Sequence, residues 1–63
     1  MTPLTRRQSQ VCDLLVKGDR NKDIAEKLGI GVRTVEDHRA TIYEKLGVRN
    51  VAELTRKVLL GAE

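Results

Sequence analysis

The residues that could do covalent chemistry are few and scattered through this chain of 63 residues. Catalysis would need at least a nucleophile with a base beside it, or several metal ligands at close spacing. The sequence holds one histidine, His38, one cysteine, Cys12, and one serine, Ser9. Its carboxylates are dispersed, and it has neither a glycine-rich phosphate loop nor a metal-ligand spacing. We therefore predict that the chain is not an enzyme and needs no cofactor or metal.

Charge and composition narrow the possible partners. The net charge is +3, from 12 basic and 9 acidic side chains, which permits a nucleic-acid partner without requiring one. The whole excess lies in residues 1–22, because residues 23–63 hold equal numbers of basic and acidic side chains. With one tyrosine and neither phenylalanine nor tryptophan, the chain lacks the aromatic platform on which single-stranded nucleic acids stack.

Length and cysteine usage indicate one small intracellular module. A single cysteine forms no intramolecular disulfide, which fits a reducing compartment. No apolar run approaches the length of a membrane span, and no signal peptide is visible. We expect one domain over residues 1–63, cytoplasmic and cut from a longer chain.

The elements that must position any site are all predicted to be helical. Thr5 and Gln8 have the spacing of a capping box, apolar residues then recur at helical spacing, and Gly18 ends a helix over about 6–17. A second helix over about 21–28 has Asp19 or Asn21 as its cap. Two more are predicted over about 32–46 and 50–60. The fold class is an all-α, compact four-helix domain.

The second and third helices are predicted to form a helix-turn-helix. Only about three residues, "GIG", join them, and so short a connection forces a sharp crossing. Ala25 is small where the helices approach, Gly29 permits the turn, and Val35 fills the core. His38, Ile42 and Leu46 continue the same apolar face of the third helix, with His38 as a half-buried packing residue.

A family resemblance follows from these motifs. The segments "LTRRQSQVCDLLVKG", "NKDIAEKLGI", "RTVEDHRATIYEKLGV" and "NVAEL" resemble the LuxR/FixJ-type helix-turn-helix domain of bacterial response regulators and quorum sensors. The resemblance covers about residues 4–60. It implies sequence-specific binding of double-stranded DNA, with the third helix in the major groove. It also implies a homodimer on DNA through the fourth helix, and an N-terminal receiver or sensor domain that this chain lacks.

The resemblance assigns base reading to Glu36, Asp37 and Ala40. Several relatives carry lysine or arginine at such positions, so the acidic pair departs from the family pattern. Acidic side chains accept from the cytosine amino group, and alanine touches a thymine methyl. The negative charge also suits the positive end of the helix. Affinity must then come from phosphate contacts elsewhere, expected at Lys22, Arg33, Thr34, Arg39, Thr41 and Lys45.

The fourth helix is the expected dimer contact. One apolar edge is predicted to face a second copy, through Val51, Leu54, Thr55 and Val58. Two alternatives remain: a sigma-factor-like helix-turn-helix, which would end near the reading helix, and a helical protein-interaction module that does not bind DNA. The near-neutral third helix favours the latter.

Overall fold

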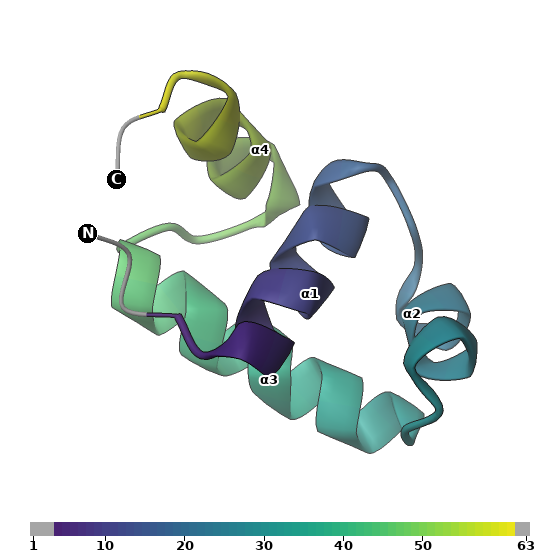
Figure 1. Ribbon diagram of the computed structural model, residues 1–63. Helices are drawn as coiled ribbons and strands as arrows, with labels where there is room; N and C mark the ends of the chain where they lie inside the picture. The colour runs from purple at the N-terminus through teal and green to yellow at the C-terminus, as the bar shows by residue number, and fades with distance from the viewer. Residues whose placement is uncertain (1–3, 62–63) are drawn as a thin grey trace.

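Four helices follow one another along residues 4–61, the part of the chain that the computed structural model describes (Figure 1). They are α1 (Arg6–Val16), α2 (Asn21–Leu28), α3 (Val32–Leu46) and α4 (Val51–Leu59). The all-α, four-helix prediction is confirmed, with every boundary within one residue of the expected one. The predicted domain extends over residues 1–63, and its residues 1–3 and 62–63 lie outside the described ones.

The start of α1 is the predicted capping box. The Thr5 hydroxyl accepts from the Gln8 amide at 3.2 Å, and the Gln8 side chain accepts from the Thr5 amide at 3.0 Å. Two amides that the first helical turn leaves free are thereby satisfied. The helix ends before Gly18, which has a φ of 97°.

The start of α2 differs from the prediction, because neither Asp19 nor Asn21 caps it. Arg20 occupies the cap position, and its amide donates to the Asp23 carboxylate at 3.2 Å. Asp19 instead accepts from Lys27 Nζ at 2.6 Å, which fastens the loop before α2 to the end of that helix. Asp23 could reach back because it lies three residues after the cap, the same spacing as in a capping box.

A tight turn sets the crossing of α2 and α3. Gly29 has a φ of 67°, in the left-handed region, and the amide of Ile30 donates to the carbonyl of Ala25 at 3.0 Å. These features form the C-terminal cap of α2. Gly31 returns to extended backbone as the cap of α3. The chain therefore reverses within three residues, and α3 crosses α2 sharply, as the helix-turn-helix prediction requires.

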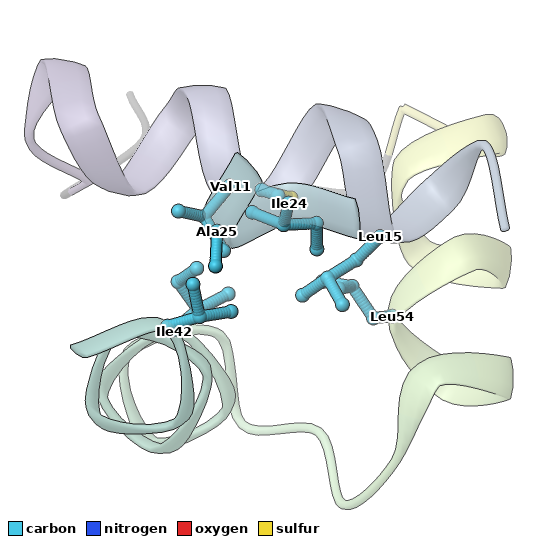
Figure 2. Packing of buried hydrophobic residues seen from close by; sticks show 8 residues of the cluster. Val11, Leu15, Ile24, Ala25, Ile42 and Leu54 are labelled. Carbon is cyan, nitrogen blue, oxygen red and sulfur yellow. The ribbon is translucent and has the colours of Figure 1, made fainter. Parts of the chain in front are cut away.

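The core lies where α1 packs against the other three helices (Figure 2). Its largest fully buried side chains come from all four helices: Val11, Ile24, Val35, Ile42 and Leu54. Asn50 caps α4 by accepting from the Glu53 amide at 2.9 Å, as predicted. Leu54 is the only fully buried residue of α4 among those described, and the half-buried Val51 of the same helix also packs against the core.

Candidate nucleic-acid interface

One long face of α3 is free of the rest of the domain. Val35 and Ile42 turn inward and have no exposed surface, which orients the helix. The opposite face carries Arg33, Glu36, Asp37, Ala40 and Glu44, all exposed. In Figure 1, α3 runs along the lower edge of the molecule, with α1 above it and α2 at its right-hand end. The major groove of DNA admits an α-helix, so a helix with one exposed face can enter it.

The three candidate base-reading residues lie together on this face. Glu36, Asp37 and Ala40 are all exposed, on the second and third turns of α3. Within residues 4–61, the Glu36 side chain forms neither a hydrogen bond nor an ion pair, so its carboxylate keeps its full acceptor capacity. The surface beside it forms a shallow hollow, lined by Glu36, Arg39, Ala40 and Tyr43.

Asp37 is differently placed. Its carboxylate lies 3.8 Å from Arg33 Nε, and both side chains are largely exposed, at 74% and 87%. A pair this long and this solvated contributes little to stability. It does, however, place opposite charges side by side, so neither residue presents an isolated charge to a phosphate.

The expectation that Glu36 and Asp37 serve the positive end of the helix is wrong. Because α3 begins at Val32, its first turn holds no acidic residue. The favourable interaction with the helix dipole falls off beyond the first turn. The interaction with the helix dipole therefore does not account for the acidic pair.

Lys22, Arg33 and Thr34 are exposed in the first turns of α2 and α3. Helix N-termini carry free amides and partial positive charge, so these are favourable positions for phosphate contacts. Thr41 is half-buried on α3 and has less surface to offer. His38 is also half-buried, on the side of the helix that the apolar spacing predicted.

Besides Arg33, two more of the candidate phosphate contacts have partners within the protein. Arg39 Nη1 donates to Asn21 Oδ1 and Nη2 donates to the Tyr43 hydroxyl, both at 3.0 Å. Lys45 Nζ donates to Gln8 Oε1 at 2.9 Å. Sequence reasoning missed these links. The four-residue spacing of Arg39 and Tyr43 was a visible signal for one of them.

The predicted dimer surface needs one correction. Leu54 is fully buried, so it contacts the core of its own chain and is unavailable to a second copy. Val51 and Thr55 are half-buried, and Val58 is 40% exposed. The most exposed large apolar side chains were not predicted as contacts. They are Leu59 and Leu60, at 74% and 71%, beside the C-terminal end of α4.

Residues 4–61 contain neither a candidate membrane span nor a candidate metal site. No helix there is long and apolar enough to cross a membrane. No group of three or more histidine, cysteine or acidic side chains is gathered there at a distance that would hold a metal ion.

A sharp two-helix turn, a supporting first helix and an open third-helix face together define a helix-turn-helix domain. Comparison with known families gives its place among them. Residues 2–58 match the model of the family described as "Bacterial regulatory proteins, luxR family". The chain belongs to this family, which confirms the resemblance seen in its motifs.

Individual relatives agree with this assignment. The chain is 48% identical over 59 residues to the transcriptional regulatory protein UhpA of Escherichia coli, covering 94% of the chain and 30% of UhpA. It is 49% identical over 49 residues to the C4-dicarboxylate transport transcriptional regulatory protein DctR of Rhodobacter capsulatus, covering 78% of the chain and 25% of DctR. It is 43% identical over 56 residues to the oxygen regulatory protein NreC of Staphylococcus aureus, covering 89% of the chain and 26% of NreC.

The chain therefore spans about 30% or less of the length of these relatives. No solved structure matches it. The family match extends into α4, to residue 58. This goes against the sigma-factor-like alternative, because a domain of that type would end near the third helix.

Proposed function

We propose that this chain binds double-stranded DNA sequence-specifically, as the effector domain of a bacterial transcriptional regulator. One observation carries the proposal: the sharp turn and the buried Val35 and Ile42 leave one long face of α3 open, in a chain that matches the luxR family over residues 2–58. The names of the relatives, which are transcriptional regulators, support it. In this proposal α3 enters the major groove and α2 lies across the phosphate backbone, as in other helix-turn-helix proteins.

Base reading is assigned to Glu36, Ala40 and Asp37. Glu36 accepts a hydrogen bond from a cytosine amino group, for which its unpartnered carboxylate is suited. The hollow beside Ala40 accommodates a thymine methyl group, which is the apolar feature of the major groove. Asp37 is the weakest of the three, because its carboxylate lies against Arg33.

Phosphate contacts supply the affinity that an acidic reading face cannot. Lys22, Arg33 and Thr34 lie at helix N-termini, where amides add to the attraction. Arg39, Thr41 and Lys45 remain candidates. For Arg39 and Lys45, internal partners already take part of the donor capacity. About two to four neutralised phosphates per subunit would give a dimer a log–log salt slope near −4 to −7.

A salt titration of DNA binding tests the function directly. Affinity for random and selected duplexes is measured at several salt concentrations for wild type, Lys22→Ala and Lys57→Ala. Lys57→Ala is the matched control, because it removes the same charge from α4, outside the proposed DNA contacts. Lys57 lines a hollow with Cys12 and Val58. We expect Lys22→Ala to weaken all sequences alike and flatten the slope, and Lys57→Ala to leave both unchanged. A flat salt response in the wild type would instead favour the protein-interaction module.

We further propose that two copies assemble on DNA through α4, using Val51, Thr55 and Val58. The exposed edge is short, and a stable dimer usually buries about 1,200 Å² or more, so we expect a monomer in the absence of DNA. Sedimentation velocity with and without a two-half-site duplex measures this. Val58→Asp should reduce binding to two half-sites while leaving binding to one half-site unchanged. A tight dimer without DNA would contradict the proposal.

The rest of the protein is proposed from the relatives' length. Because the chain spans about 30% of UhpA, we propose that an N-terminal receiver or sensor domain precedes it in the whole regulator, and that the regulator acts in the cytoplasm. The test is to express the full-length regulator and sequence the genomic fragments that it binds. The bound fragments would also identify the operator.

A further inference from the structure

Arg39 lies at the centre of a polar cluster that joins the two helices of the helix-turn-helix. Its guanidinium donates through Nη1 to Asn21 Oδ1 and through Nη2 to the Tyr43 hydroxyl. The guanidinium carbon also lies 5.5 Å from the centre of the Tyr43 ring. All three side chains are half-buried. Asn21 is the first residue of α2, whereas Arg39 and Tyr43 are one turn apart on α3.

This arrangement depends on the shape of arginine and not only on its charge. The guanidinium is a planar fork whose two outer nitrogens donate in fixed, divergent directions. Here one arm reaches across to α2 and the other remains on α3. The Tyr43 ring lies close enough to interact with the cation and help fix its plane. A lysine has the same charge but a single ammonium on a flexible stem, so it cannot hold both partners in one orientation.

The cluster also connects the two sets of proposed DNA contacts. Asn21 precedes Lys22, a proposed phosphate contact on α2. Arg39 and Tyr43 line the same hollow as Glu36 and Ala40, the proposed base readers on α3. The Arg39 side chain therefore links the reading face directly to the phosphate-binding end of α2, in addition to the turn at Gly29 and the core that the two helices share. A recognition site needs such support, because small errors in placing its contacts cost affinity.

We propose that Arg39 is a positioning residue that sets α3 against α2 and so determines how well the domain distinguishes its operator from other DNA. This inference rests on the proposed DNA-binding function. It replaces the simpler expectation that Arg39 is only a phosphate contact. The two ideas differ in what they require. Positioning requires Asn21, Tyr43 and the fork of the arginine, whereas a phosphate contact requires only the positive charge.

The experiment compares variants that break the cluster with and without changing charge. Asn21→Ala and Tyr43→Phe each remove one partner and keep Arg39, while Arg39→Lys keeps the charge and loses the fork. We expect each to lower affinity for the selected operator by about 3- to 10-fold, the range of one or two hydrogen bonds. Affinity for random duplex and the salt slope should stay at the wild-type values, because no charge is lost.

Two controls separate positioning from a general loss of structure. Arg7→Lys is the matched control, because Arg7 is an exposed arginine on α1 outside every proposed DNA contact, so this variant should bind as wild type. A double-mutant cycle between Asn21→Ala and Arg39→Lys should be non-additive, since both break one link. Thermal unfolding of every variant ensures that binding is measured on folded protein. A general loss of stability would lower operator and random binding together.

The outcomes are distinguishable. If Arg39→Lys, Asn21→Ala and Tyr43→Phe all bind the operator as wild type does, the inference is overturned. Arg39 would then be a phosphate contact only. Wild type without salt-dependent DNA binding would instead overturn the proposed function, and the role of Arg39 in specificity with it. Amide hydrogen exchange adds a readout without DNA: Arg39→Lys should speed exchange in α2, and unchanged exchange would contradict the link between the helices.

Discussion

Lys45 Nζ lies 2.9 Å from Gln8 Oε1, and the same oxygen accepts from the Thr5 amide at 3.0 Å. One side chain thus completes the capping box of α1 and holds the last turn of α3, which lies 37 residues further along the chain. The start of α1 and the end of α3 are therefore joined through a single amide oxygen, Gln8 Oε1.

Changing Gln8 tests this double role. Gln8→Ala removes the acceptor for both Thr5 and Lys45, and we expect it to lower the free energy of unfolding by about 1 kcal/mol. For a domain of this size that is a fall of about 4–8 °C in Tm. Gln8→Glu keeps the acceptor and adds a negative charge near Lys45 and the α1 N-terminus, so it should be at least as stable as wild type.

Thermal unfolding followed by circular dichroism gives the measurement. Gln10→Ala is the matched control, because Gln10 is an exposed glutamine on the same helix. If Gln8→Ala and Gln10→Ala melt at the same temperature, neither the cap nor the link to Lys45 contributes to stability.

A second prediction concerns two glycines that lie two residues apart in the turn. Gly29 has φ 67° and ψ 36°, where a side chain costs about 1–2 kcal/mol, although a Cβ there would meet no atom within 4 Å. Gly31 has φ −77° and ψ 155° at the cap of α3, where serine is preferred and where a Cβ meets Thr34 Oγ1 only at 3.9 Å.

The same substitution should therefore have opposite effects at the two positions. Gly29→Ser should destabilise the domain by about 1–2 kcal/mol through backbone strain. Gly31→Ser should stabilise it by a few tenths of a kcal/mol to about 1 kcal/mol, by capping α3 and restricting the unfolded chain. Urea unfolding measures both, and equal losses of stability would contradict the backbone explanation.

Much of this fold could be predicted because its signals are local. The capping box at Thr5, the stop at Gly29 and the cap at Asn50 depend on residues within a turn of one another. The cap of α2 was mispredicted because Asp19 and Asp23 are both within reach of that terminus. Only the folded structure shows that Lys27 engages Asp19.

The candidate site was predictable in part for the same reason. The open face of α3 followed from the spacing of its apolar residues. Helical spacing on α4, however, does not tell which apolar residue faces the core, and Leu54 was wrongly assigned to a dimer contact. The link from Arg39 to Asn21 depends on where α2 lies, because Asn21 is 18 residues away in the sequence, and no local pattern contains that information.

The buried cysteine makes a prediction about pH. Cys12 is 5% exposed, and burial, followed by the nearby Asp13 charge, raises the pKa of its thiol above the ordinary value of 9.0. The folded domain therefore keeps a proton that the unfolded chain releases, so this contribution to stability is complete below pH 9.0 and is lost as the pH rises above it. Cys12→Ala should show a smaller fall in stability between pH 8 and pH 10.

Urea unfolding of both proteins across this range tests the prediction. Other groups that titrate there are common to wild type and variant, so the difference between the two curves isolates Cys12. Wild-type stability that falls no more steeply than that of Cys12→Ala would mean that the thiol titrates alike in the folded and unfolded chains.

The final prediction returns to the acidic pair on α3. If Glu36 accepts from a cytosine amino group, its loss should remove about 1–3 kcal/mol of discrimination, which is about 5- to 150-fold in preference at one base pair of each half-site. Glu36→Ala also removes a negative charge that faces the phosphates, so affinity for random DNA should rise. Asp37→Ala should raise affinity for random DNA with little change in preference, because Asp37 lies beside Arg33 and its loss frees that arginine for a phosphate.

Selection from a randomised site with wild type and both variants measures the preference, and binding to random duplex measures the general affinity. A solvent-exposed acidic pair without contact to bases would leave all three sequence profiles the same. If Glu36→Ala returns the wild-type profile, Glu36 does not read bases, and Arg33, Ala40, Thr41 or the shape of the DNA must carry the specificity.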